Sequence, residues 1–281
     1  MMELRKLERE EHIRTRALWE AVFTEDSPEF LDYYYKVKAA ENEIYAIEED
    51  GEIVSMIHLN PYQMRMGDEI YQTHYIVAVA TKEQVRGRGL MRSLLTHVLQ
   101  VMKERGEPFT FLMPASEAIY KPFGFAFIYE QKRGYVTGKE STDESLAFRL
   151  ATEADCKRIA EFANEFLKSY DVVAWRDAAY YRILLAEQES ENGGILLAER
   201  NGKLSGVFCF TRGERLEIRE PLCENRDILE YAVRYLTGNE TERAFCTGYG
   251  EETKPVIMAK ILHPEMAGDF LTAKVFLNEV V

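Results

Sequence analysis

The chain has 281 residues and a formal net charge of −13, with 35 Lys and Arg against 48 Asp and Glu. This length allows two domains, each with its own core. The negative balance disfavours a nucleic-acid partner, and no apolar run approaches the roughly 18 residues of a membrane span.

Two further features of composition narrow the class of protein. The four cysteines and five histidines are dispersed, without the C-x-x-C spacing of a zinc site or a disulfide framework, so we expect no metal. The N-terminal residues are charged and lack the apolar region of a signal peptide, so we expect a cytoplasmic protein.

The first part of the chain predicts a strand, two helices and a β-meander. Residues 4–7 read as a strand and residues 11–23 as a helix, and Ser27-Pro28 supplies the start of a second helix over 30–37. Asp50-Gly51 indicates a hairpin between strands 44–47 and 53–57. A second turn at Gly67-Asp68 extends the meander through 63–66 and 69–73.

The stretch from Tyr75 to Leu99 predicts an anion site. A buried strand over 76–81 is followed by Gln84-Val85-Arg86-Gly87-Arg88-Gly89 and by an amphipathic helix that opens at Leu90. Free N–H groups at a helix start, with the positive end of the helix dipole behind them, bind anions. A P-loop would need Gly-Lys-Ser/Thr here, and a dinucleotide fingerprint would need a third glycine, so both are disfavoured.

A Val- and Ala-rich strand, then Gln/Arg-x-x-Gly-x-Gly, then a helix resembles the coenzyme loop of the GCN5-related N-acetyltransferase (GNAT) family. The resemblance implies that acetyl-CoA is the acyl donor and that its diphosphate binds to the loop amides. The residues implied for the diphosphate are Val85, Arg86, Gly87, Arg88, Gly89 and Leu90. The backbones of Val77 and Val79 would hold the pantetheine arm.

A second motif follows a short strand over 109–113. Ser116 opens a short helix that Pro122 ends, and the run Tyr120-x-x-Phe123-Gly124-Phe125 resembles the Eis-like branch of the GNAT family. The resemblance places Tyr120 near the coenzyme sulfur, as proton donor to the leaving thiolate. The alternative is a packing role, since the chain has sixteen tyrosines. Ser116 is either a helix cap or a coenzyme contact.

The resemblance also implies where the acceptor binds. In this fold the first two helices and their connection line the acceptor side, so Glu25, Asp26 and Phe30 are candidates for contacting the substrate. The alternative for an acidic loop before a helix is an N-terminal cap. The general base is left open between Glu117, His74 and a water chain.

The second half of the chain repeats the first in a degenerate form. After a linker over 134–144, a strand, two helices and a hairpin around Asn201-Gly202 recur. Where the glycine loop should return, residues 219–225 hold no glycine and two carboxylates, Glu220 and Glu224. The expected domains are therefore a catalytic one over 1–134 and a degenerate GNAT-like one over 145–281.

This tandem arrangement also resembles the Eis-like branch, whose longer members add a sterol-carrier-like third domain that we expect to be lacking here. In those members the terminal carboxylate acts as the base, a role that the resemblance does not carry to Val281. The expected fold class is α/β (α+β), with two tandem GNAT-like domains, each a mixed and mainly antiparallel sheet flanked by helices.

The functional expectation is an acetyl-CoA-dependent N-acetyltransferase acting on a small cationic amine, aminoglycoside-like or polyamine-like. Two alternatives stay open: a non-catalytic acyl-CoA-binding sensor or assembly protein, and an acetyltransferase of protein lysines or N-termini. The expected partners include neither nucleic acid nor membrane, and a homo-oligomer is an alternative to a monomer.

Overall fold

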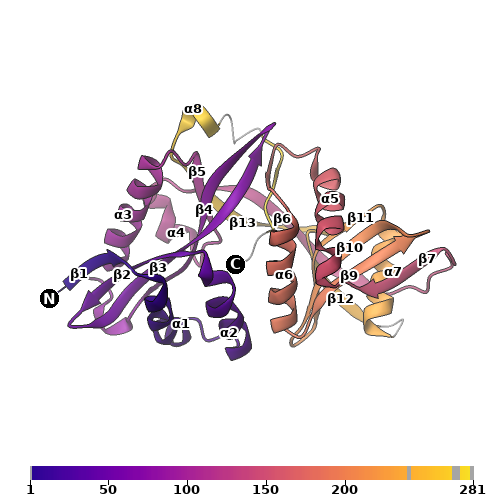
Figure 1. The fold of residues 1–281 in the computed structure, drawn as a ribbon, viewed down its shortest axis with the longest axis horizontal. Helices are drawn as coiled ribbons and strands as arrows, with labels where there is room; N and C mark the ends of the chain where they lie inside the picture. Colours follow the sequence, from indigo (N-terminus) through magenta and orange to yellow (C-terminus); the bar gives the residue numbers. More distant parts are fainter. Residues whose placement is uncertain (1, 239–241, 268–272, 279–281) are drawn as a thin grey trace. The chain divides into compact units, whose positions relative to one another are not determined.

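A computed structural model describes residues 2–238, 242–267 and 273–278, which form two compact units (Figure 1). Unit 1 contains the described residues of Met1–Tyr129, Asp171–Trp175 and Val256–Val281. Unit 2 contains those of Glu130–Tyr170 and Arg176–Pro255. Each unit has a mixed, mainly antiparallel sheet flanked by helices, so the expected fold class is confirmed.

Unit 1 is built on a sheet with the strand order β1-β2-β3-β4-β5-β13, in which only β4 and β5 are parallel neighbours. Its main strands are β1 (Met2–Lys6), β2 (Glu43–Glu49), β3 (Glu52–Met66), β4 (Glu69–Thr81), β5 (Phe109–Leu112) and β13 (Glu252–Ile261). Two short strands, β8 (Val172–Ala174) and β14 (Val275–Phe276), add to it through β3. Its helices are η1 (Arg9–Thr15), α1 (Arg16–Val22), α2 (Pro28–Lys36), η2 (Lys38–Ala40), η3 (Glu83–Val85), α3 (Leu90–Glu104), α4 (Glu117–Tyr120), η4 (Lys121–Phe123) and α8 (Pro264–Ala267).

The two faces of β3 are covered by different helices. Ile57 and Leu59 belong to a buried cluster with Leu94, Val98 and other apolar residues of α3. His58, between them in the sequence, points to the opposite face and contacts aromatic rings of α1 and α2. This alternation is what a strand buried on both faces requires.

Local turn and cap signals of the sequence are confirmed. Asp50 and Gly51 have φ of +52° and +85°, and Asn201 and Gly202 have +51° and +77°, as tight hairpins between twisted strands require. At the start of α2, the Ser27 side chain accepts a hydrogen bond from the Phe30 N–H (3.1 Å), and Pro28 occupies the first helical position.

Three predicted boundaries were wrong. The strands expected over 53–57 and 63–66 are one 15-residue strand, β3, and those over 69–73 and 76–81 are both parts of β4. The start of the expected linker, Gly134–Thr137, belongs to β6 (Ala126–Thr137). In each case pairing with a neighbouring strand continues through a segment whose polar residues suggested a break.

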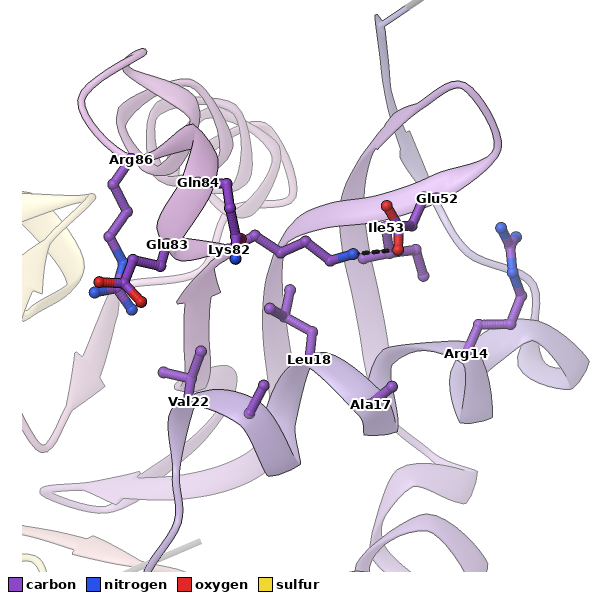
Figure 2. A pocket seen from close by; sticks show the side chains of 11 residues that line it. Arg14, Ala17, Leu18, Val22, Glu52, Ile53, Lys82, Glu83, Gln84 and Arg86 are labelled. Atoms are coloured by element: carbon purple, nitrogen blue, oxygen red, sulfur yellow. Dashed lines mark ion pairs between the residues drawn. The ribbon is translucent and has the colours of Figure 1, made fainter.

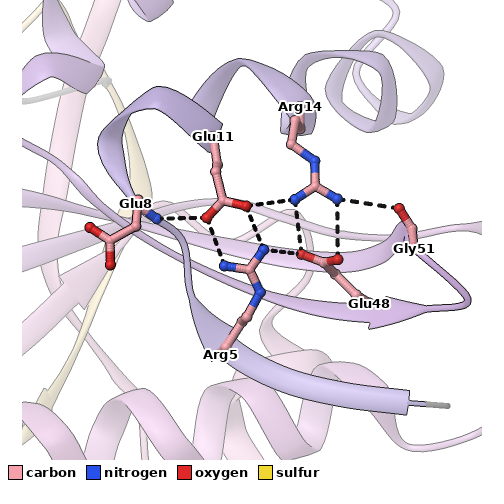
Figure 3. A network of polar contacts seen from close by, with 6 residues as sticks. All are labelled: Arg5, Glu8, Glu11, Arg14, Glu48 and Gly51. Carbon is pink, nitrogen blue, oxygen red and sulfur yellow. Dashed lines mark hydrogen bonds and ion pairs between the residues drawn. The ribbon is translucent and has the colours of Figure 1, made fainter.

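A surface network ties the N-terminal segment of unit 1 to the β2–β3 hairpin (Figure 3). The Arg5 guanidinium donates to Glu11 of η1 (2.6 and 2.7 Å) and to Glu48 of β2 (2.5 Å). Arg14 bonds the same two carboxylates and the Gly51 carbonyl (3.2 Å). The bonds from Arg5 lower the pKa of Glu11 to about 2, so this carboxylate stays ionised at any ordinary pH.

Unit 2 has the strand order β6-β12-β11-β10-β9-β7, with β11 and β12 parallel. Its elements besides β6 are β7 (Leu146–Leu150), η5 (Glu153–Asp155), α5 (Cys156–Leu167), α6 (Ala178–Ser190), β9 (Gly194–Arg200), β10 (Lys203–Arg212), β11 (Leu216–Cys223), α7 (Arg226–Thr237) and β12 (Arg243–Thr247). The apolar face of α7 packs on this sheet as α3 packs on the sheet of unit 1.

The two units share an unusual detail, a β-bulge at the same place in the sheet. In unit 1, Ala78 (φ +51°) and Val79 of β4 lie opposite the single residue Ile57 of β3. In unit 2, Glu220 (φ +53°) and its neighbour on β11 lie opposite the single residue Phe208 of β10. A positive φ at two non-glycine residues is costly, and its recurrence supports the reading of unit 2 as a repeat of unit 1.

The compact units differ from two consecutive halves of the chain. Residues 171–175 and the segment from Val256 onward belong to unit 1, because β8 pairs with β3 and β13 pairs with β5. The division into a catalytic and a degenerate domain stays a prediction. Val281 lies outside the described residues.

Candidate functional site

Strands β4 and β5 separate at the centre of unit 1. Among the described strands, β5 pairs with β4 only at Tyr75↔Phe111, although β4 continues to Thr81. The bulge at Ala78 bends β4 just beyond this pair. Val77 and Val79 lie in the part of β4 that β5 no longer pairs with, and both residues are only partly buried. Their backbone groups on this side are thus available to an extended ligand, as their predicted role requires.

The predicted glycine loop lies between the end of β4 and the start of α3. Gly87 and Gly89 both have φ of +80°, a left-handed conformation that glycine adopts without strain, and open space surrounds the position of a Cβ at each. The first helical bond runs from the Ser93 N–H to the Gly89 carbonyl (3.0 Å). The amides of Leu90 and Met91 therefore have no helical acceptor and can bind an anion.

The side chains of Arg86 and Arg88 are already engaged. Arg88 makes two hydrogen bonds to the Glu49 carboxylate of β2 (2.8 and 2.9 Å). The Nε of Arg86 donates to the Thr81 carbonyl (3.1 Å). Both arginine side chains are thus hydrogen-bonded within the protein, which leaves fewer of their donors for an anion. The backbone amides of the loop remain the main donors.

Tyr120 lies in the same buried cluster as Ile76 of β4, Leu90 of α3 and Leu112 of β5. The structure thus brings the predicted proton donor next to the predicted coenzyme loop, with 6% of the residue exposed. Its ring meets Phe125 edge-on (5.9 Å), and its hydroxyl bonds to no other described residue. Burial raises the pKa of Tyr120 to about 12, so the phenol is protonated at any ordinary assay pH but is a weaker acid than a free tyrosine.

Three other residues were predicted near the thioester, as a coenzyme contact or as candidate bases. Ser116 occupies the cap position of α4, but its side chain makes no capping bond and is exposed, so its hydroxyl is available to a ligand. Glu117 pairs with Lys121 on the surface (3.3 Å). His74 forms a buried pair with Glu107 (2.8 Å) before β4 and β5 separate.

The predicted acceptor side is connected to the bulge by a path of contacts. The Trp19 indole of α1 donates to the Asp26 carboxylate in the loop before α2 (2.7 Å). The same indole meets His58 edge-on (5.4 Å), and His58 lies directly opposite Val77 in the β3–β4 pairing. Phe30 is buried, 6% exposed, and packs on Tyr33 and Tyr34, so only Asp26 of the two predicted residues presents a polar group here.

Comparison with known protein families decides the identity of this region. The model of a family described as acetyltransferase (GNAT) domain matches residues 3–128. Unit 1 contains a GNAT acetyltransferase domain. The predicted resemblance is thereby confirmed, and the protein is an N-acetyltransferase.

Solved structures extend this similarity over the whole chain at the level of the fold. A probable N-acyltransferase from Enterococcus faecalis V583 superposes with a TM-score of 0.77 at 15% identity, covering 93% of this chain and 73% of that one. A GCN5-related N-acetyltransferase from Anabaena variabilis gives 0.74 at 15%, covering 94% and 73%. Eis1 from Mycobacterium abscessus gives 0.66 at 11%, covering 93% and 74%. A search of curated proteins with the sequence found no match.

Sequence reasoning missed a buried polar cluster in the GNAT domain, next to the bulge. The Tyr34 hydroxyl donates to Asn60 Oδ1 (3.1 Å) and accepts from Asn42 Nδ2 (2.9 Å). Its one proton is thereby used, so His58 Nδ1, 3.0 Å away, must donate to it. A neutral His58 then carries its lone pair on Nε2, which is buried without a partner among the described residues. Two polar residues at alternate positions, 58 and 60, in a mostly apolar stretch of β3 were the available signal.

His58 predicts an acid sensitivity of the GNAT domain. Burial, with a smaller contribution from His12, lowers the pKa of His58 to about 3. Below the usual histidine pKa of about 6.5, His58 is protonated in the unfolded chain but stays neutral in the folded chain. The free energy of unfolding therefore decreases as pH falls from 6.5 towards 3. We expect His58 to account for about 2 kcal/mol of unfolding free energy lost between pH 6.5 and 4.5.

Urea unfolding of the wild type and of His58→Gln at both pH values measures this difference. The variant should lose correspondingly less stability on acidification, while His97→Gln, at an exposed histidine of α3, should behave as the wild type. An acid response that His58→Gln leaves unchanged would contradict a buried neutral His58.

A pocket of about 380 Å³ lies beside the predicted glycine loop of the GNAT domain (Figure 2). Ala17, Leu18 and Val22 of α1 form its apolar wall. Lys82, ion-paired to Glu52, lies at its rim. Arg86 of the predicted glycine loop also lines this pocket, whereas Val77, Val79 and Tyr120 do not, so the pocket adjoins the loop and not the bulge.

The corresponding place in unit 2 is closed. No glycine loop follows β11, and the Asn225 side chain instead caps α7 by accepting from the Ile228 N–H (3.2 Å). At the bulge, the Glu220 carboxylate binds the fully buried Arg176 guanidinium through two hydrogen bonds. Unit 2 therefore has a buried ion pair at its bulge, where the GNAT domain has Ala78.

Two searches of the described residues gave negative results. No helix within 2–238, 242–267 and 273–278 is long and apolar enough to cross a membrane. Over those same ranges, no group of three or more His, Cys, Asp or Glu side chains could hold a metal ion.

Proposed function

We propose that unit 1 transfers the acetyl group of acetyl-CoA to a primary amine of a small cationic acceptor, aminoglycoside-like or polyamine-like. The observation that carries this proposal is the separation of β4 from β5 at the Ala78 bulge, with free helix amides at one end and the Tyr120 phenol in the adjoining cluster. One site then offers donors for a diphosphate, a strand edge for an extended amide chain and a proton donor.

The residues fit the coenzyme. The amides from Val85 to Leu90 would hold the diphosphate, because Gly87 and Gly89 leave open space where a Cβ would stand. The backbones of Val77 and Val79 would pair with the pantetheine amides, and an amide there would polarise the thioester carbonyl. One such donor contributes about 3 kcal/mol when it faces the developing oxyanion. The exposed Ser116 hydroxyl is a further contact for the pantetheine arm.

Tyr120 would act on the leaving group. Bound acetyl-CoA supplies the activated acyl group, and transfer to an amine leaves a thiolate that needs a proton. With a pKa of about 12 against about 8.5 for a thiol, the phenol first stabilises the thiolate by a strong hydrogen bond. When the phenol passes its proton to the sulfur, the phenolate regains a proton from solvent, which balances the proton that the amine releases. An unbonded hydroxyl can turn toward the sulfur without breaking an existing bond.

The acceptor would approach from the side of α1 and α2. Asp26 is held by the Trp19 indole there, and Glu25 is an exposed neighbour. Together with the net charge of −13, these carboxylates favour cationic acceptors by raising their local concentration. Loss of the amine proton to water or to Glu117 completes the reaction.

Calorimetry with acetyl-CoA, followed by thiol-release assays over a panel of aminoglycosides, polyamines and lysine peptides, tests this proposal. We expect acetyl-CoA binding and thiol release with the small polycations. Binding without release on any amine would identify an acyl-CoA sensor instead, and release with peptides alone would identify a protein acetyltransferase. No binding of acetyl-CoA would reject all three.

A further inference from the structure

Strand β7 is the last strand in the sheet of unit 2 (Figure 1). Among the described strands it pairs with β9 alone, so one side of it is open. The free N–H and C=O groups of an edge strand can bind a further strand, and charged residues or proline usually protect such an edge. The edge strand of the unit 1 sheet, β1, carries Glu3, Arg5 and Lys6 among its five residues, whereas β7 carries only Arg149. The β7 edge is therefore poorly protected.

The backbone of the even-numbered residues forms the open side of β7. The Ser145 carbonyl and the Ala151 N–H, at the two ends of the strand, are hydrogen-bonded on the side of β9 (3.4 and 2.8 Å). Alternate residues of an antiparallel strand direct their N–H and C=O groups to opposite sides. Leu146, Phe148 and Leu150 therefore direct theirs away from β9.

Two of these outward groups are used within the chain. The Leu146 N–H donates to the Asp143 carbonyl (3.1 Å), and the Leu150 carbonyl accepts from the Arg149 guanidinium (3.2 Å). Within the part of the chain that the structure describes, no hydrogen bond engages the other groups. These are the N–H and C=O of Phe148, the N–H of Leu150 and the C=O of Leu146.

The unbonded groups are self-complementary. In an antiparallel pair of two β7 strands centred on Phe148, the Phe148 N–H of each copy faces the Phe148 carbonyl of the other. In the same register, the Leu150 N–H of each copy faces the Leu146 carbonyl of the other. The two groups that are already bonded within the chain would face each other, so the pairing needs neither of them.

The side chains match in the same register. Leu146 and Phe148 pack against the buried cluster under α7, and Leu150 shares their face of the strand. Leu150 is 55% exposed, as is 52% of Tyr235, which stacks on Phe148 with 5.4 Å between ring centroids. In the pair, Leu150 would lie opposite Leu146 and Phe148 opposite Phe148, and directly opposite apolar side chains stabilise paired strands.

The single charge of β7 does not oppose this pairing. Arg149 would lie opposite Ala147 of the other copy, so no like charges meet across the pair. Its guanidinium is bound by Asp155 of its own chain through two hydrogen bonds (2.5 and 2.9 Å).

We propose that β7 binds the β7 strand of a second copy of this chain, antiparallel and with two-fold symmetry about Phe148. The sheets of the two unit 2 copies then form one continuous sheet. The symmetry of the free groups favours a second copy over an extended peptide of another protein. The proposal is independent of the proposed acetyl transfer.

Sedimentation equilibrium of the full chain over a range of concentrations tests the proposal. We expect the wild type to reach an even multiple of the mass of one chain, and Leu150→Lys to halve that mass, since a lysine at the edge opposes strand pairing. The matched control is Ile13→Lys, at a residue of η1 that is 53% exposed, which should leave the mass unchanged. Circular dichroism checks that both variants are folded.

Amide hydrogen exchange of the wild type identifies the strand without any variant. The Phe148 and Leu150 amides should exchange about tenfold more slowly or less in the associated protein than after dilution, while the amides of β1 should not change. A single-chain mass at every concentration would overturn the proposal. So would an associated mass that a folded Leu150→Lys variant keeps, or equal slowing of exchange in β1 and β7.

Discussion

Replacing Tyr120 with phenylalanine is expected to lower kcat about a hundredfold while the Kd for acetyl-CoA stays within a factor of two, as for loss of a general acid. The substitution removes only a hydroxyl that bonds to no other described residue, so the ring and its contact with Phe125 are kept. Because burial holds the pKa of Tyr120 near 12, the wild-type rate should not fall between pH 8 and 10 through ionisation of this group. Thiol-release kinetics at saturating donor, with calorimetry for Kd, measure both effects.

The matched control is Tyr45→Phe, which removes a phenol hydroxyl from the same buried cluster. This variant should keep kcat near that of the wild type. Unchanged turnover in Tyr120→Phe would remove the phenol from the mechanism and leave the thiolate to water. Equal losses in both variants would point to packing of the cluster instead.

The second large effect is expected at Gly89. Replacing it with aspartate should weaken coenzyme A binding by a hundredfold or more, since a carboxylate close to the diphosphate repels it by about 4 kcal/mol per charge pair before screening by salt. Replacing it with asparagine should cost only a few-fold. The two side chains have the same shape and both tolerate the left-handed conformation at φ of +80°, and open space surrounds the Cβ position.

The pair of variants separates charge from backbone effects. Calorimetry with coenzyme A at low and high salt measures the Kd of each variant. The loss of affinity in Gly89→Asp should become smaller as the salt concentration increases. Equal binding by the wild type and Gly89→Asp would show that the diphosphate binds elsewhere. Equal losses in both variants would assign the effect to the backbone.

Local signals let the sequence predict much of the fold. The glycine turns of both hairpins, the Ser27 cap and the amphipathic pattern of α3 are each decided within a few residues, and each is confirmed. The resemblance to the GNAT family is confirmed, and the strand, turn and helix that carried it are adjacent in the chain.

What the sequence could not predict depends on contacts between distant residues. The bulge at Ala78 is fixed by the register of β3 against β4, and nothing in an alanine favours a positive φ. The hydrogen bonds that Arg88 donates to Glu49 join segments about 40 residues apart, so the engagement of this arginine could not be predicted from the sequence. The neutral state of His58 likewise needs the helices that bury it.

The sheet of unit 1 contains strands from two separate parts of the chain, and this limits which deletions the protein can tolerate. Its sheet needs β8 and β13, and both are encoded after the residues that begin unit 2. The two copies are therefore interlaced rather than placed end to end. A deletion of residues 130–255 would therefore also remove β8 from the sheet of unit 1.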